Sequence, residues 1–220
     1  MKVCEIFRSI EGEGLRTGLP AVFIRLHGCN LRCSYCDSMY AVEGTDYKQM
    51  NVAQVLDAVK KFSGITHVTL TGGEPLIHQD VEELLRQLSG NGYRVNIETN
   101  GTVPCKWHFP GLFYTMDWKC KSSGMTAKMK MENLETLGSN DVLKFVVGTI
   151  EDLKETENVV KSLAEKKSDM PHLFVSPVFG NLSNEEIVNW LLNSNIMVKN
   201  NVRFQVQLHK IIWDPERRGV

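Results

Sequence analysis

Residues 21–38 have the sequence AVFIRLHGCNLRCSYCDS, in which a short apolar run leads into a loop that holds three cysteines. The run from Ala21 to Leu26 is rich in branched and aromatic residues and predicts a buried strand. In an open parallel sheet, ligands gather outside the carboxyl ends of the strands. The cysteine loop therefore marks the expected position of a functional site.

The rest of the chain repeats this alternation of apolar runs and amphipathic segments, which predicts strand and helix units wound into a parallel sheet. Helices are predicted at 52–59 and 81–88, after Thr149 and from Ser183. About six or seven strands are too few for a closed eight-stranded barrel, so we expect a single α/β domain over residues 1–220, an open partial βα barrel reduced in helices. The predicted strands are 21–26, 67–70, 94–98, 112–116, 142–147, 172–175 and 202–207.

The composition is that of an ordinary folded domain, with 42% hydrophobic and 23% charged residues among 220. The formal net charge is −1, so no global basic field exists to hold a nucleic acid. No apolar run approaches the roughly 18 residues of a membrane span, and charges interrupt residues 1–14 where a signal peptide would be apolar. We expect a cytoplasmic protein that binds neither nucleic acid nor membrane.

Unusual polar motifs follow four successive predicted strands. Because the carboxyl ends of parallel strands share one edge of the sheet, we expect these motifs to converge on one rim. Two irregular stretches, 39–50 and 119–140, are expected to be loops that cover the site. The motifs are the cysteine loop at 27–38, TGGEP at 71–75, ETNGT at 98–102 and DWKCK at 117–121.

Cys29, Cys33 and Cys36 supply three thiolates within one loop, enough to hold three irons of an iron-sulfur cluster and leave the fourth open to a small molecule. The alternatives are a zinc site completed by His27, or thiols without metal. Zinc sites prefer two pairs of ligands, and no second pair is evident in the sequence. The isolated cysteines, expected to be inert packing residues, are Cys4, Cys105 and Cys120.

The cysteine spacing, with Tyr35 before the third cysteine, resembles the radical S-adenosylmethionine (SAM) superfamily, and TGGEP resembles the turn that binds the SAM amino group there. On its own, TGGEP would be an ordinary strand-to-helix turn. The resemblance implies a [4Fe-4S] cluster that binds SAM and cleaves it to a 5'-deoxyadenosyl radical, while the protein orients the reactants and excludes solvent. It also implies SAM contacts from Tyr35, Asp37, Gly73, Asp117, Trp118, Lys119 and Ser176.

Motifs along the whole chain resemble the 7-carboxy-7-deazaguanine synthase family. They are FRSIEGEG at 7–14, Arg25, CDS at 36–38, ETNG at 98–101 and the tail at 207–215. The resemblance implies conversion of 6-carboxy-5,6,7,8-tetrahydropterin to 7-carboxy-7-deazaguanine and ammonia by hydrogen-atom abstraction and ring contraction, in queuosine and deazapurine biosynthesis. It further implies a flavodoxin or ferredoxin-type electron donor and a homodimer.

The residues themselves are chemically suited to a pterin, which has a planar hydrogen-bonding edge and a carboxylate. Glu98 can accept from ring N–H groups, and Arg25 can grip a carboxylate, or it can be satisfied by a neighbouring acid. The family resemblance implies that the Ser38 hydroxyl is a ligand for Mg2+. Without it, Ser38 would be interpreted as a loop or capping serine. The substrate residues implied are Ile10, Glu11, Gly12, Arg25, Thr71, Glu98 and His209.

Two details and two other functions stay open. Glu11 stands where the family resemblance leads us to expect glutamine, which changes the hydrogen-bond pairing if its side chain meets substrate. His209 and Lys210 either close the substrate site at a carboxyl-terminal strand or lie at a surface strand end. The competing functions are a radical SAM activase of a glycyl-radical enzyme, and a zinc-stabilised binding module without catalysis.

Overall fold

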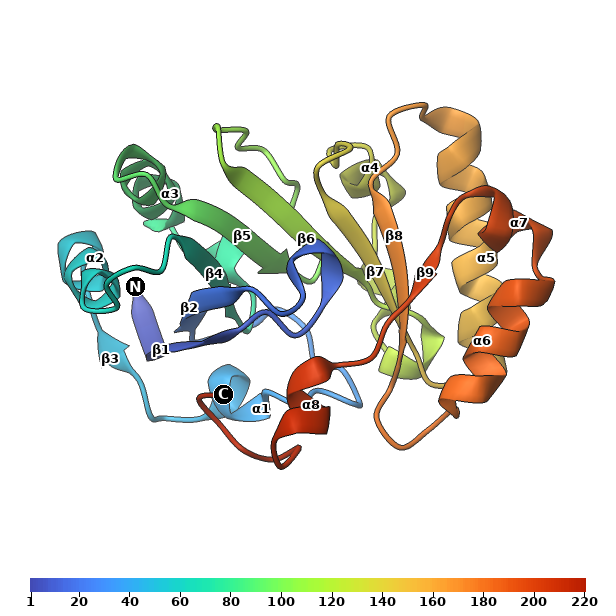
Figure 1. Cartoon of the computed structure of the whole chain (residues 1–220), viewed down its shortest axis with the longest axis horizontal. Coiled ribbons are helices and arrows are strands. Elements are labelled where there is room, and N and C mark those ends of the chain that lie inside the picture. Colours follow the sequence, from blue (N-terminus) through green and yellow to red (C-terminus); the bar gives the residue numbers. More distant parts are fainter.

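The computed structural model describes residues 1–220 and contains one nine-stranded sheet in the order β3-β1-β2-β4-β5-β6-β7-β8-β9 (Figure 1). Every pair from β2 to β9 is parallel, whereas β1 is antiparallel to β2 and to β3. The predicted open parallel sheet is confirmed. The strands are β1 Lys2–Ile10, β2 Pro20–Leu26, β3 Lys48–Gln49, β4 His67–Gly72, β5 Arg94–Thr99, β6 Leu112–Trp118, β7 Val142–Val147, β8 His172–Pro177 and β9 Arg203–Phe204.

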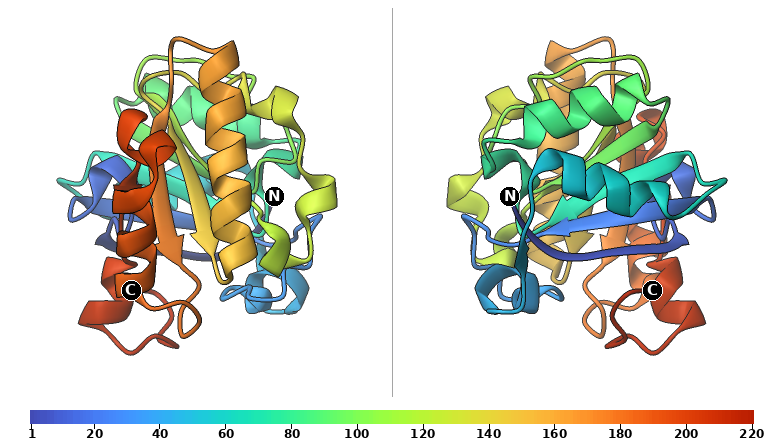
Figure 2. Two further views of the ribbon diagram at one scale, coloured as in Figure 1. Left: turned by 90° about the vertical axis from the view of Figure 1, so that its right-hand side faces the viewer. Right: turned by 90° about the vertical axis from the view of Figure 1, so that its left-hand side faces the viewer.

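Helices cover the convex face of the sheet, with α5 on one side and α2 and α3 on the other (Figure 2). No helix is both long and apolar enough to cross a bilayer. The α-helices are α1 Met39–Glu43, α2 Val52–Lys60, α3 Val81–Gly90, α4 Met131–Leu134, α5 Ile150–Lys166, α6 Asn184–Asn193, α7 Asn195–Lys199 and α8 Leu208–Ile212, and the 3-10 turns are η1 Gly14–Arg16, η2 Pro75–Ile77, η3 Lys121–Ser123 and η4 Thr126–Lys128.

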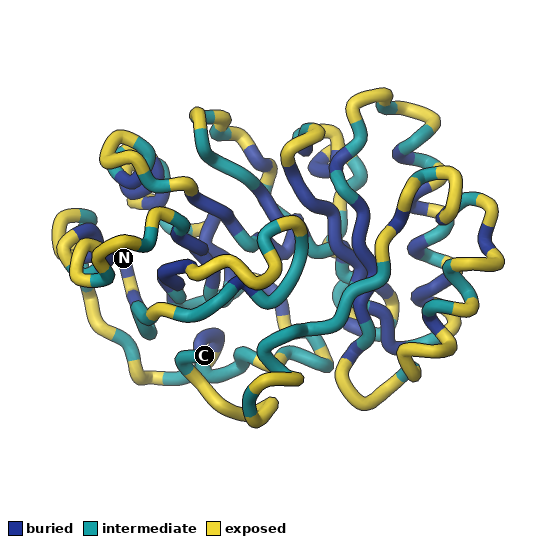
Figure 3. The backbone as a smooth tube through the Cα atoms, viewed as in Figure 1, coloured by how far each residue is buried: buried dark blue, intermediate teal, exposed yellow.

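The core lies between the central strands and the outer helices, where the strands are buried along most of their length (Figure 3). On α3 the apolar residues at helical spacing, Val81, Leu84, Leu85 and Leu88, are fully buried, as the sequence predicts. The predicted capping box at Ser183 is also confirmed, because its hydroxyl accepts from the Glu186 backbone N–H. This packing fixes the carboxyl ends of the strands as one rigid rim.

Two parts of the sheet differ from the sequence prediction. Strand β1 was not predicted, because Lys2, Glu5 and Arg8 interrupt its apolar residues. The expected strand 202–207 contains only β9, and His209 and Lys210 lie on α8 instead of a strand. The last backbone bond to β8 is from the Gln205 N–H to the Val175 carbonyl at 3.0 Å, and the Gln205 side chain accepts from the Gly14 N–H at 2.7 Å.

The two stretches expected to be irregular contain short elements. Residues 39–50 include α1 and β3, and residues 119–140 include η3, η4 and α4. These pieces are too short to give a periodic sequence signal. Figure 2 shows α1 and α8 both lying beyond the carboxyl ends of the parallel strands.

Candidate functional site

A cavity of about 650 Å³ opens at the carboxyl ends of the parallel strands. All four predicted motif segments reach it, with lining residues from 29–38, 71–73, 98–100 and 117–119. The amino-terminal motif and the tail from Gln207 to Val220 also line it. The prediction that separate segments converge on one rim is therefore confirmed.

The three clustered cysteines are free thiols of intermediate exposure that line this cavity. Burial raises the pKa of Cys33, and the nearby Lys119 ammonium opposes that shift. No other cysteine lines the cavity: Cys105 and Cys120 are buried, and burial raises the pKa of both thiols. The cavity therefore offers three thiol ligands to a metal centre, and no fourth cysteine is available there.

The three sulfurs are not gathered closely enough to surround one ion. They do not all lie within 4.8 Å of one another. Ligands of a single tetrahedral zinc, with Zn–S bonds of about 2.3 Å, would have sulfurs about 3.8 Å apart. His27 is engaged elsewhere, since its Nε2 lies 2.6 Å from the carbonyl oxygen of Gly44. The residues present therefore fit a [4Fe-4S] cluster.

The TGGEP turn packs directly on the cysteine loop. The Glu74 N–H donates to the Gly28 carbonyl at 2.9 Å. A Cβ at Gly73 would overlap the Gly28 carbonyl oxygen and crowd Cys29, so only glycine allows this approach. Gly73 consequently exposes its backbone to the cavity beside the thiols.

Glu74 is an internal anchor and does not line the cavity. Its side chain is fully buried and accepts from the N–H groups of Leu76 and Asn100 and the hydroxyl of Thr99. Burial raises its pKa to about 7. The carboxylate links the end of β4 to the end of β5. These bonds fix the position of the TGGEP motif relative to the ETNGT motif.

A group of ion pairs around the buried Lys144, the ion-pair wall, consists of Glu13, Asp117, Lys119 and Lys144. The Lys144 ammonium lies 2.8 Å from Glu13 and 3.1 Å from Asp117, and Lys119 lies 2.9 Å from Asp117. The two cations hold the pKa of the Asp117 carboxyl below its usual range. Neither Lys144 nor Glu13 is among the predicted site residues, although a lysine inside the apolar run VLKFVV was a usable signal.

Arg25 fits both of its sequence-based interpretations. Its Nε donates to Glu5 on the neighbouring strand at 2.8 Å, and Tyr40 donates to the same oxygen. The guanidinium still lines the cavity, and its two terminal nitrogens have no protein acceptor. The ion pair therefore fixes the side chain and leaves its two terminal nitrogens free for a ligand.

Glu98 and Thr71 meet on the cavity wall. The Thr71 hydroxyl donates to the Glu98 carboxylate at 2.6 Å. Burial raises the pKa of Glu98, opposed by the nearby Lys144. One carboxylate edge remains available to accept from a ligand.

The amino-terminal motif and α8 close over the cavity together. The Leu208 N–H donates to the Gly12 carbonyl at 3.1 Å, and a Cβ at Gly12 would overlap the His209 ring. Lys210 pairs with Asp37 at 3.0 Å, which links α8 to the cysteine loop. The cavity is therefore partly enclosed by contacts between distant parts of the chain.

Three predicted site residues do not line the cavity. Glu11 is 2% exposed, its carboxylate accepts from Thr69, and its backbone pairs with Leu19 and Gly18. Trp118 alternates with Asp117 along β6, so its indole faces away and donates to a helix residue, Glu155.

Ser176, the third of these residues, is buried in register with Val146, which does line the cavity. Its hydroxyl has no hydrogen-bond partner. Ser176 therefore faces the same side of the sheet as Val146, although its buried hydroxyl does not reach the cavity lining.

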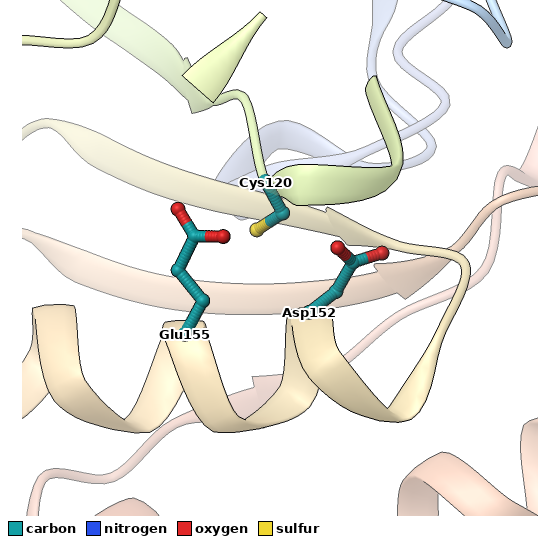
Figure 4. A group of neighbouring side chains, drawn as sticks. All are labelled: Cys120, Asp152 and Glu155. Carbon is teal, nitrogen blue, oxygen red and sulfur yellow. The ribbon is translucent and has the colours of Figure 1, made fainter. Parts of the chain in front are cut away.

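Cys120, Asp152 and Glu155 form a compact group outside the cavity (Figure 4). Their ligand atoms lie within 4.8 Å of one another, but the carboxylates already accept backbone N–H groups. Asp152 accepts from Ser122, and Glu155 accepts from Lys121. The group therefore anchors η3 to α5, and η3 in turn receives two hydrogen bonds from Ser34, within the cysteine loop.

Comparisons with known proteins identify relatives along the full chain. The Radical SAM superfamily model matches residues 23–107. The 7-carboxy-7-deazaguanine synthase of Clostridium acetobutylicum is 42% identical over 100% of this chain and 99% of its own. The enzyme of the same name from Methanospirillum hungatei is 43% identical over 98% of this chain and 86% of its own.

Solved structures share the fold. The crystal structure of QueE from Escherichia coli superposes with a TM-score of 0.74 at 24% identity, covering 94% of each chain. The structure of Streptococcus suis SuiB bound to S-adenosylmethionine has a TM-score of 0.59 at 13% identity, over 84% of this chain and 51% of that one. Both comparisons concern the fold alone.

Proposed function

The chain belongs to the 7-carboxy-7-deazaguanine synthases of the radical SAM superfamily. On that premise we propose a role for each site residue in converting 6-carboxy-5,6,7,8-tetrahydropterin to 7-carboxy-7-deazaguanine and ammonia. It is a radical SAM lyase of queuosine and deazapurine biosynthesis. The observation that carries the proposal is the set of three free thiols on one cavity with no fourth cysteine beside them.

Cys29, Cys33 and Cys36 hold the [4Fe-4S] cluster. When bound, the cluster and SAM supply the 5'-deoxyadenosyl radical that removes a hydrogen atom from the substrate. The exposed backbone of Gly73 receives the SAM amino group, since no side chain stands between it and the cavity. Tyr35, Asp37, Asp117 and Lys119 line the cavity near the thiols and orient the rest of SAM.

Arg25 and Glu98 bind the substrate. The two terminal nitrogens of Arg25 match a carboxylate in a bidentate pair, because Glu5 holds the guanidinium in place. The free edge of Glu98 accepts from pterin N–H groups, with Thr71 fixing the other oxygen. Ile10, Gly12 and His209 cover the substrate and exclude water, which protects a radical from other hydrogen donors.

Ser38 is our proposed protein ligand for Mg2+. Its side chain lines the cavity, and its only hydrogen-bond neighbour is the Cys36 sulfur at 3.9 Å. Magnesium binds few protein oxygens when a substrate carboxylate and waters complete its coordination. By family resemblance we also propose a flavodoxin or ferredoxin-type donor, a homodimer, and the reducing cytoplasm as the compartment, which keeps the thiols free.

The enclosed cavity favours a small-molecule reaction over a glycyl-radical activase. An activase must admit a polypeptide loop, whereas α8 is bonded to Gly12 and Asp37 across this opening. A non-catalytic zinc module is disfavoured by the sulfur spacing.

The test is anaerobic reconstitution with iron and sulfide, followed by incubation with SAM, Mg2+, a reductant and the carboxy-pterin. We expect 7-carboxy-7-deazaguanine and one equivalent of ammonia, with weaker activity when Mg2+ is omitted. A protein that carries four irons, cleaves SAM and forms no deazapurine would contradict the proposed substrate. A colourless protein with one zinc after anaerobic purification would contradict the cluster.

A further inference from the structure

Cys29 differs from the other two cluster cysteines in its hydrogen bonds. Its sulfur receives the Leu31 N–H at 3.4 Å and the Asn100 side-chain amide at 3.5 Å. Cys33 has no such donor, and Cys36 has only the Ser38 hydroxyl at 3.9 Å. The environment of the three sulfurs is therefore asymmetric.

Asn100 belongs to a closed ring of three side chains, the Asn30–Asn100–Thr102 ring. Asn30 donates to the Thr102 hydroxyl at 2.8 Å, and that hydroxyl donates to the Asn100 oxygen at 2.6 Å. The Asn100 amide donates back to the Asn30 oxygen at 2.9 Å. Its second amide hydrogen is left to point at the Cys29 sulfur.

The orientation of the Asn100 amide is fixed by a group that can only donate. The Thr102 backbone N–H donates to Asn100 Oδ1 at 3.0 Å, so the amide nitrogen must be on the opposite side, toward Cys29. The backbone of Asn100 is held as well, by its N–H bond to the buried Glu74 carboxylate. Asn100 is itself 6% exposed, which leaves it little freedom to turn away.

We propose that Asn100, held by this ring, is a positioning residue that sets the reduction potential of the cluster through its N–H bond to Cys29. The inference rests on the proposed radical SAM function. One electron from a flavodoxin or ferredoxin-type donor reduces the cluster from the 2+ to the 1+ state, and the donor loses that electron. An N–H group on a ligand sulfur stabilises the more negative state, so it raises the potential.

The test compares variants of the reconstituted full-length protein in redox titrations followed by electron paramagnetic resonance, without SAM. Asn100→Leu keeps the size of the side chain and removes the donor, so one-electron reduction should become about tenfold less favourable, a midpoint lower by about 59 mV. Asn100→Asp should lower it further, because it adds a negative charge. Thr102→Val should cause a smaller decrease, since it opens the ring and keeps the amide.

Ser34→Ala is the matched control, because Ser34 lies between Cys33 and Cys36 and its hydroxyl donates only to the Ser122 carbonyl and to no sulfur. Its midpoint should equal that of the unchanged protein. Pulsed resonance of the reduced cluster should also show an exchangeable amide proton coupling that Asn100→Leu lacks.

Unshifted midpoints in Asn100→Leu and Thr102→Val, with four irons bound, would overturn the inference. If Asn100→Leu fails to hold the cluster, Thr102→Val decides alone, a decrease supporting the inference and an unchanged value refuting it. Failure of the unchanged protein to make deazapurine would instead count against the proposed function, since the midpoints are measured without substrate.

Discussion

The two sides of the cavity are held by different kinds of interaction. Around Cys29, the contacts are neutral hydrogen bonds from backbone groups and from the Asn30–Asn100–Thr102 ring. At β6 and β7, the ion-pair wall holds the structure through buried charges. The cysteine loop gains charge when it binds a cluster, and neutral donors accommodate that charge without an ion of their own. In the ion-pair wall, two ammonium groups balance the charge of two carboxylates. Such a wall can lie beside a zwitterion, which is the form of the amino acid part of SAM.

The largest expected effect comes from the cysteine side. Replacing Cys29, Cys33 or Cys36 by Ala should abolish SAM cleavage, because a cluster with two protein ligands is not retained. The measurement is 5'-deoxyadenosine formed under anaerobic conditions, with iron content determined on the same samples. Cys105→Ala is the control, since that thiol is buried away from the cavity. Full cleavage by all three variants would refute the cluster assignment.

A substitution in the ion-pair wall should reduce the stability of the fold. Lys144→Met leaves Glu13 and Asp117 without their shared cation in a buried site, and we expect a loss of about 3 kcal/mol or more in the free energy of unfolding. Urea unfolding monitored by circular dichroism measures it. Adding Glu13→Gln to this variant should recover part of the loss, whereas additive losses would show that the two groups are not coupled.

Glu11 offers a pH-dependent test close to the same wall. Burial raises its pKa from 4.5 to about 7, so between these pH values the folded state keeps a proton that the unfolded state has released. The free energy of unfolding should therefore fall as the pH rises through this interval. Between pH 5 and pH 8, the free energy of unfolding of Glu11→Gln should decrease by about 2 kcal/mol less than that of the unchanged protein.

Glu74 contributes a similar dependence through its own raised pKa and remains in the Glu11→Gln variant, so part of the decrease should persist. Urea unfolding at the two pH values checks this prediction. Identical pH profiles for the variant and the unchanged protein would show that Glu11 is not protonated in the folded state.

Arg25→Ala should have the smallest effect on the protein and a specific effect on substrate. The cluster and SAM cleavage should persist, while substrate binding weakens by at least about 1.5 kcal/mol through loss of the charge-assisted pair. Substrate affinity measured by calorimetry with SAM present checks this. Glu5→Gln is the companion variant, and it should weaken binding less, because it frees the guanidinium without removing it. If the substrate affinity of Arg25→Ala is unchanged, Arg25 has only a structural role.

The features predicted from the sequence were those with a local signal. The parallel strands have apolar runs, and the cysteine loop has a fixed spacing within residues 29–36, so both could be found without a structure. Glu11, Trp118 and Ser176 were placed at the site by resemblance, and in the structure none of the three lines the cavity. Sequence position alone does not say which way a strand residue faces.

The features that were missed depend on distant contacts. Lys144 meets Glu13 across 131 positions, and Asn100 meets Cys29 across 71. Neither pair has a periodic pattern that joins its members. Helix α8 was missed because it is only five residues long and is held by Gly12 from the other end of the chain.

The bond between Leu208 and Gly12 has a consequence for how the protein is made. Residues 20–118, which carry the thiols and the strands around them, leave the ribosome long before α8 does. The cover over the cavity therefore forms only after residue 212 has been synthesised. Until then the thiols of the nascent chain lack the cover that α8 gives them in the complete fold.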